Sequence, residues 1–178
     1  MTKKTLSELS FDKTNKIIVC DYNNKFIDLD DTKGILNRLQ SPNSPDMVYI
    51  SNAKKEIWFV EFKSSNQRCL ESYKEKIKLR KKIFSALFLI YEIFCEKVCE
   101  YKDYNKFYFI VFRHEKKSYE DELMDNLALN TMSNGKRDIL FGLEDLKPQF
   151  VKDIFTEDCV ELKKLFKKRF DIEFIKED

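Results

Sequence analysis

The sequence predicts an α/β protein in which a mixed central sheet is flanked by helices. Only 3 Gly and 3 Pro occur in 178 residues, which favours long uninterrupted elements over the many tight turns of an all-β fold. A strand pattern, a long helical pattern and a continuous apolar strand follow one another, and this order is typical of a crossover between parallel strands. The hydrophobic share of 43% is large enough for a core, and a chain of this length is expected to form one domain.

The first third of the chain is predicted to contain two short strands and a helix. Their ranges are 17–22, 25–29 and about 30–39. Asn23-Asn24 supplies a turn, because asparagine tolerates the required backbone geometry, and the second strand is expected to return beside the first. Asp30 or Asp31 can cap the helix, which ends before a segment that contains two prolines.

A hairpin follows, and its register can be counted from the sequence. Its strands are residues 47–51 and 56–63, joined by a four-residue turn. Counting outward from that turn along the antiparallel pairing places Asp46 directly opposite Glu61. Because side chains alternate across a strand, Lys63 lies on the same face as Glu61.

This arrangement predicts a metal-dependent hydrolase. Opposed Cβ atoms in a sheet are about 4.5–5.5 Å apart, so two carboxylates at Asp46 and Glu61 repel each other. A divalent cation makes the pair favourable, since Mg²⁺ prefers carboxylate oxygens and completes its shell with phosphate and water. The Lys63 ammonium can orient an attacking water or stabilise charge that develops on phosphorus. These groups suit the hydrolysis of a phosphodiester.

The motif resembles that of the PD-(D/E)xK phosphodiesterase superfamily, whose members have the restriction-endonuclease-like fold. The match consists of Pro45-Asp46, fourteen intervening residues and Glu61-Phe62-Lys63. The resemblance implies that Asp46, Glu61 and the Phe62 carbonyl bind Mg²⁺, for which Mn²⁺ can substitute. It also implies that Lys63 is the catalytic lysine.

The same resemblance implies an organisation for the whole chain. A single nuclease-like domain would have its core at about 30–112 and a C-terminal helical extension of unassigned role at 113–178. A homodimer is expected by analogy, since two active sites cut two strands. The family often adds an acidic residue from an upstream helix, and Glu8, Asp30 and Asp31 are all candidates.

A long helix is predicted over about residues 70–100, and its first third is basic. The segment KEKIKLRKK, residues 74–82, carries six positive charges and one negative charge. Lys74, Lys78 and Lys81 recur at helical spacing and predict a face that binds the DNA backbone. For any individual lysine, a solvated helix face explains the pattern slightly better than a DNA-binding groove does.

The remainder of the chain is predicted to contain a buried strand and two helices. KFYFIVF, residues 106–112, is apolar apart from its first residue, as in a central strand that is covered on both faces. One helix is expected at about 118–129. Another starts after Thr156 with acidic residues first and basic residues last, an order that complements the helix dipole.

The net charge and the cysteine content bear on the binding partner and on the cell compartment. The net charge is +2, so only local clustering of lysines can create a surface for nucleic acid. Five cysteines without a recognisable secretory signal indicate free thiols in a reducing cytoplasm. The longest apolar run, residues 83–95, is shorter than a membrane span and contains Glu92. We therefore expect a cytoplasmic protein with DNA as its partner and no membrane association.

Three functions fit these observations. A Mg²⁺-dependent DNA endonuclease, acting in restriction, phage defence or DNA repair, is the favoured one. A catalytically inactive nuclease-like domain that binds nucleic acid or protein is the first alternative. A small regulator with an accidental Glu-x-Lys is the second. The scarcity of glycine disfavours nucleotide-binding loops, and the single histidine, His114, leaves little material for a histidine-based metal site.

Overall fold

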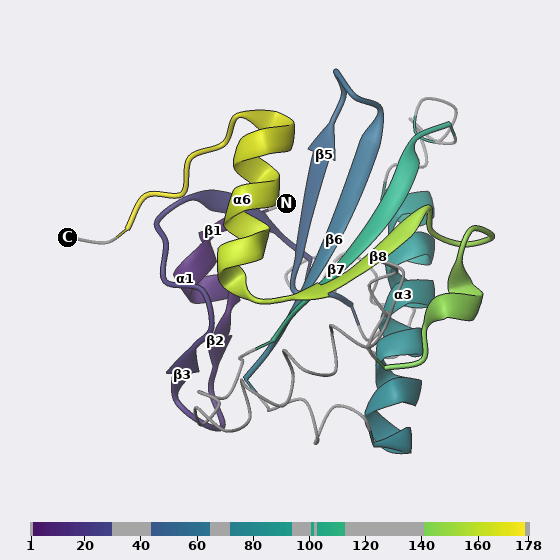
Figure 1. The fold of residues 1–178 in the computed structure, drawn as a ribbon, viewed down its shortest axis with the longest axis horizontal. Helices are drawn as coiled ribbons and strands as arrows, with labels where there is room; N and C mark the ends of the chain where they lie inside the picture. The colour runs from purple at the N-terminus through teal and green to yellow at the C-terminus, as the bar shows by residue number, and fades with distance from the viewer. Residues whose placement is uncertain are drawn as a thin grey trace, which may run out of the picture.

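The computed structural model describes residues 2–29, 44–64, 72–93, 101, 103–112 and 141–176, and it shows an α/β fold built on a mixed six-stranded sheet (Figure 1). The strand order is β1-β4-β5-β6-β7-β8. Neighbouring strands from β1 to β6 are antiparallel, whereas β7 and β8 run parallel to β6. The strands are β1 (Lys3–Thr5), β4 (Lys25–Asp28), β5 (Met47–Ser51), β6 (Glu56–Lys63), β7 (Asn105–Phe112) and β8 (Asp153–Glu157).

Helices cover both faces of this sheet. In Figure 1, α3 lies on one side of the strands, and α6 and α1 lie on the other. A separate two-stranded ribbon, β2 with β3, follows α1. These elements are α1 (Leu6–Leu9), β2 (Phe11–Asp12), β3 (Ile17–Ile18), α3 (Tyr73–Ile93), the 3₁₀ turn η3 (Glu144–Leu146) and α6 (Cys159–Phe170).

The hairpin of β5 and β6 has the register predicted from the sequence, with Ser51 opposite Glu56. Its side chains alternate between two hydrophobic cores, one beneath each helical layer. Phe59 belongs to the core beneath α3, and Trp58 belongs to the core beneath α6. The predicted buried strand is also confirmed, because the last six residues of β7, from Phe107, are buried.

The N-terminal strands pair differently from the prediction. The segments 17–22 and 25–29 do not form a hairpin with each other. Instead, β3 pairs with β2, and β4 lies between β1 and β5. The sequence KKT of β1 is short and polar, so it carries no strand signal of its own, and without β1 the prediction gave β4 the wrong partner.

The C-terminal part contains a strand in addition to helix. β8 extends the sheet beyond β7, which the expectation of a purely helical extension missed. The predicted last helix is confirmed as α6, where the Asp158 side chain accepts a hydrogen bond of 2.9 Å from the Glu161 N–H. Basic residues occupy its final turn, as the dipole argument requires.

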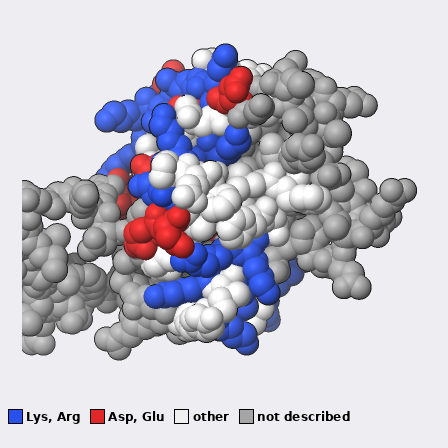
Figure 2. Space-filling model, turned by 90° about the vertical axis from the view of Figure 1, so that its right-hand side faces the viewer, with Lys and Arg blue, Asp and Glu red and all other residues white. Residues whose placement is uncertain are grey.

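The long predicted helix is described as α3, over Tyr73–Ile93. The helices expected at about 30–39 and 118–129, together with Asp30 and Asp31, lie outside the described residues. Figure 2 shows the side of the molecule that carries α3, with basic side chains in two areas separated by acidic and uncharged surface. In the described ranges, no helix has the length and apolar character that a membrane crossing requires.

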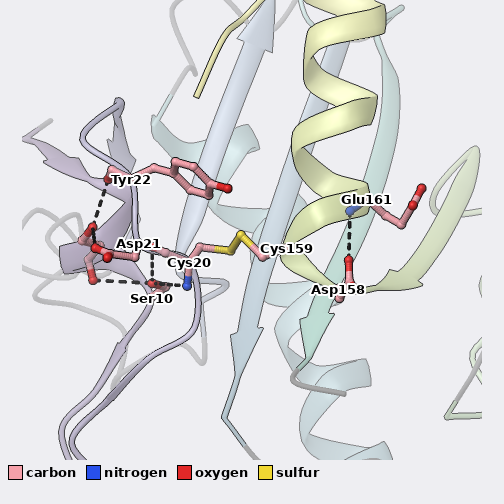
Figure 3. Close-up of a disulfide and its surroundings, with 8 residues drawn as sticks. Ser10, Cys20, Asp21, Tyr22, Asp158, Cys159 and Glu161 are labelled. Carbon is pink, nitrogen blue, oxygen red and sulfur yellow. Dashed lines mark hydrogen bonds between the residues drawn. A yellow bond between two sulfur atoms is a disulfide. The ribbon is translucent and has the colours of Figure 1, made fainter. Parts of the chain in front are cut away.

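A disulfide joins Cys20 to Cys159, so the prediction of free thiols is wrong for these two residues (Figure 3). Their Cα atoms are 5.7 Å apart although 139 positions separate them in the chain. Cysteines so distant in sequence give no spacing signal, and only the packing of the segment after β3 against the start of α6 brings them together. The cytoplasmic location stays a prediction, and it loses the support of free thiols at these positions.

Candidate active site

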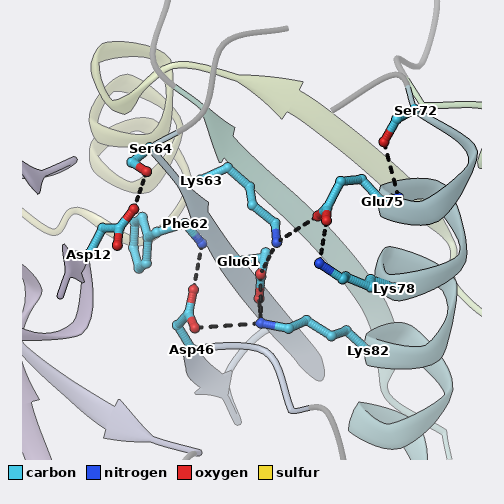
Figure 4. A network of polar contacts seen from close by, with 10 residues as sticks. All are labelled: Asp12, Asp46, Glu61, Phe62, Lys63, Ser64, Ser72, Glu75, Lys78 and Lys82. Atoms are coloured by element: carbon cyan, nitrogen blue, oxygen red, sulfur yellow. Dashed lines mark hydrogen bonds and ion pairs between the residues drawn. The ribbon is translucent and has the colours of Figure 1, made fainter. Parts of the chain in front are cut away.

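Asp46 and Glu61 meet at the open end of the β5–β6 hairpin, as the register predicts (Figure 4). Asp46 Oδ2 accepts a hydrogen bond of 2.6 Å from the Phe62 N–H, which fixes this carboxylate against β6. The Glu61 side chain is only 1% exposed, whereas that of Asp46 is 21% exposed. Burying an unpaired charge is costly, so a carboxylate as deeply buried as Glu61 is expected to have a cationic partner.

Lys82 of α3 supplies that cation, and the sequence interpretation missed it. Its Nζ lies 2.6 Å from both Glu61 oxygens and 3.7 Å from Asp46 Oδ1 (Figure 4). Lys82 directly precedes Ile83 and lies three residues after Leu79, and both of these side chains are fully buried. A lysine at the border of a buried helical stripe was the available signal, but five other cations within residues 74–82 obscured it.

Lys63 also points into this group of charges. Its Nζ lies 3.1 Å from Glu61 Oε1 and 3.6 Å from Glu75 Oε2. Burial raises the pKa of the Glu75 carboxyl, but hydrogen bonding from Lys78 and the charge of Lys63 outweigh it, so the pKa is lowered overall. Lys63 therefore sits between the carboxylates of Glu61 and Glu75, which together hold its ammonium in place.

These residues line a cleft of about 620 Å³. Segment 4–19 lies along the cleft together with the end of β6 and the first turns of α3. Its charged side chains are six carboxylates and five lysines, so it carries no excess of positive charge. Of the three upstream acidic candidates, Glu8 lines the cleft, but its carboxylate accepts a hydrogen bond of 2.7 Å from the Thr5 N–H in a helix cap. This cap explains Glu8 without a catalytic role.

The β2–β3 ribbon is tied to the end of β6 through Asp12. The carboxylate of Asp12 accepts hydrogen bonds from the Ser64 hydroxyl and from the Asn15 amide (Figure 4). These hydrogen bonds, the one from Ser64 first, lower the pKa of Asp12 to about 2. Because Ser64 directly follows Lys63, the ribbon helps to fix the lysine-bearing end of the strand.

The predicted DNA-binding lysines are only partly brought to the cleft. All three are exposed, but Lys78 alone lines the cleft, where it pairs with Glu75. Lys74 and Lys81 lie on the outer side of α3 and do not line it. The row of residues 75, 78 and 82 borders the buried stripe of the helix, which is why this row, rather than 74, 78 and 81, faces the carboxylates.

Tyr108 of β7 places an unusual polar group near the site. Its hydroxyl is fully buried and has no hydrogen-bond partner among the described residues. Burial raises the pKa of this phenol well above its usual value, and the negative charges of Glu61 and Asp46 raise it further. A neutral hydroxyl is therefore held close to the carboxylate pair.

Asp46 and Glu61 form a pair rather than a larger cluster. Within the described ranges, no group of three or more His, Cys, Asp or Glu side chains is arranged to hold a metal ion. Comparisons with protein-family models, with curated proteins and with solved structures found no match. The resemblance to the PD-(D/E)xK superfamily therefore depends on the motif and its register alone.

Proposed function

We propose that the protein is a metal-dependent nuclease that hydrolyses DNA phosphodiester bonds. The observation that carries the proposal is the convergence of Asp46, Glu61 and Lys63 in one cleft. Both carboxylates are also in contact with the ammonium of Lys82. Two carboxylates and a lysine at the carboxyl end of a strand are the groups that phosphodiester hydrolysis with Mg²⁺ requires.

The donor set fits a hard divalent cation. Asp46 and Glu61 would hold Mg²⁺, or Mn²⁺ in its place, together with the carbonyl oxygen of Phe62, whose N–H already contacts Asp46. A metal held by only two carboxylates keeps positions for water and phosphate oxygens. When bound there, it would polarise a phosphoryl oxygen and lower the pKa of a bound water.

The charge of the cleft supports the same conclusion. Six carboxylates and five lysines give it no net attraction for a polyanion. A divalent cation at Asp46 and Glu61 would reverse that balance at the point where the phosphate must approach. We therefore expect DNA to bind productively in the cleft only when the metal is present.

Lys63 would act directly on the reacting groups. Its ammonium is held 3.1 Å from Glu61 Oε1, which keeps it beside the proposed metal position rather than in bulk solvent. From there it can orient the attacking water or stabilise the charge on the phosphate. The contact of the same ammonium with Glu75 Oε2, at 3.6 Å, helps to hold it from the helix side.

DNA contacts outside the cleft would follow α3. Lys78 stands at the cleft, and Lys74 and Lys81 continue a row along the exposed side of the helix, where backbone contacts would be salt-dependent. A homodimer, a cytoplasmic location and a role in restriction, phage defence or repair belong to the same proposal. Phe84 and Phe88, 44% and 42% exposed on α3, offer apolar area for such a dimer.

A second candidate is an inactive nuclease-like domain that binds nucleic acid or protein. One observation favours it, since Lys82 satisfies both oxygens of Glu61 without any metal. Permanent occupation of the site by this ammonium would leave binding without hydrolysis.

The deciding experiment is DNA cleavage with Mg²⁺ or Mn²⁺. Plasmid, linear duplex, single-stranded and branched DNA would be incubated with the wild type, with Lys63→Ala and with Lys152→Ala, which changes an exposed lysine away from the cleft. We expect cutting that requires the metal, is lost in Lys63→Ala and persists in Lys152→Ala. Cutting by Lys63→Ala at the wild-type rate would contradict the proposal.

A further inference from the structure

We propose that Lys82 is a positioning residue that occupies the cation position of this site, so that its ammonium and a divalent metal exclude each other at Glu61. The inference goes beyond the proposed nuclease function and rests on it, because it takes Asp46 and Glu61 as the metal-binding carboxylates. It assigns the metal-free protein a resident cation supplied by its own chain.

The position of the ammonium carries the argument. Lys82 Nζ lies at the same distance, 2.6 Å, from the two oxygens of Glu61. It therefore sits on the bisector of that carboxylate, where a cation held by both oxygens would also sit. The 3.7 Å contact with Asp46 shows that the same ammonium faces the second carboxylate. A metal at about 2.1 Å from these oxygens would overlap it.

Burial leaves the metal little choice of approach. Glu61 is covered by protein on its remaining sides, and Lys63 already contacts Oε1. Lys82 and Glu61 both line the cleft, and the ammonium contacts the two carboxylate oxygens that a metal arriving from that volume would use. Binding of a metal to Glu61 therefore requires the ammonium to leave.

Lys82 has room to leave. Its four-carbon stem can swing the ammonium from Glu61 into the cleft while the backbone of α3 stays in place. Once displaced, the charge would face the volume where the phosphate of a substrate must bind. The exchange also means that the buried carboxylate is never left without a cation, which would otherwise be strongly destabilising.

The first test is Mn²⁺ affinity, measured by titration calorimetry on the wild type and Lys82→Met. Methionine matches the unbranched stem of the lysine side chain and removes the ammonium with its competing charge. We expect Lys82→Met to bind Mn²⁺ roughly 10- to 100-fold more tightly, the factor that corresponds to a hydrogen bond to a charged group. Lys82→Gln, which keeps a hydrogen-bond donor without the charge, should show a smaller gain and replaces Lys82→Met if that variant does not fold. Lys152→Met should behave as the wild type.

The second test uses the wild type alone. An amine-acylating reagent would be applied with and without Mn²⁺, and modification of each lysine would be mapped by mass spectrometry. We expect Mn²⁺ to increase the modification of Lys82 and to leave that of Lys152 unchanged. A structural ion pair that never opens would give no such increase.

The outcomes separate this inference from the proposed function. Tighter Mn²⁺ binding by Lys82→Met, including binding only by that variant, supports the inference. Equal or weaker binding by Lys82→Met and Lys82→Gln, with unchanged modification of Lys82 in the wild type, overturns the inference but leaves the metal site intact. Absence of Mn²⁺ binding from the wild type and from both variants overturns the inference and the proposed function together.

Discussion

Replacing Tyr108 with phenylalanine is expected to stabilise the protein, which is the opposite of what most core substitutions do. The Tyr108 hydroxyl is fully buried, and none of the described residues forms a hydrogen bond with it. An unsatisfied buried hydroxyl costs about 1–3 kcal/mol, while removal of one oxygen from a packed core loses only about 0.5 kcal/mol of contacts. The free energy of unfolding should therefore rise by about 1–2 kcal/mol.

Urea unfolding of the wild type and Tyr108→Phe measures this change, provided that the two m-values agree. Tyr104→Phe is the matched control, because the Tyr104 hydroxyl lies 3.4 Å from Asn52 Oδ1 in an exposed contact. We expect the control to change stability by less than about 0.5 kcal/mol. Destabilisation of Tyr108→Phe by about 1 kcal/mol or more would show that the hydroxyl has a partner in the native protein, and the reasoning would then be wrong.

Three further predictions concern the framework of the site. Because the folded pKa of Asp12, about 2, lies below its unfolded value, the ionised carboxylate contributes stability above about pH 4 that is lost as the pH falls through 2. The free energy of unfolding of the wild type and of Asp12→Asn, measured as a function of pH, should differ less and less as the pH falls through that range. A difference that does not change with pH would contradict the lowered pKa of Asp12. Reduction of the Cys20–Cys159 disulfide should lower the free energy of unfolding, measured in urea, by about 2–5 kcal/mol. The double variant Cys20→Ser with Cys159→Ser should not respond to the reductant. Identical curves with and without reductant would exclude a stabilising disulfide. Arg169→Met should lower the free energy of unfolding by about 2 kcal/mol, because it leaves the buried Glu56 carboxylate without its guanidinium partner. An unchanged midpoint of urea unfolding would refute this.

The elements that were predicted correctly are those whose signals are local. The four-residue turn at 52–55 fixes the register of the β5–β6 hairpin, and that register alone brings Asp46 and Glu61 together. Strand β7 was recognisable because a strand buried on both faces must be apolar throughout. In each case one continuous stretch of the chain contains the whole physical reason.

The features that were missed depend on contacts between distant segments. Lys82 is one of six cations in its segment, and only the packing of α3 on β6 selects it as the partner of Glu61. Strand β8 has few apolar residues and is recognisable only through its pairing with β7. The Cys20–Cys159 disulfide likewise follows from tertiary packing, which no sequence spacing encodes.

The measurement that tests the central claim most directly is Mn²⁺ binding to the wild type, Asp46→Asn and Glu61→Gln. Asp145→Asn serves as the control, since Asp145 is an exposed carboxylate that pairs with Arg80 and does not line the cleft. If Asp46 and Glu61 form a divalent cation site, Mn²⁺ binds the wild type and Asp145→Asn, and binding is lost in the other two variants. Wild-type affinity retained in Asp46→Asn and Glu61→Gln would contradict the account.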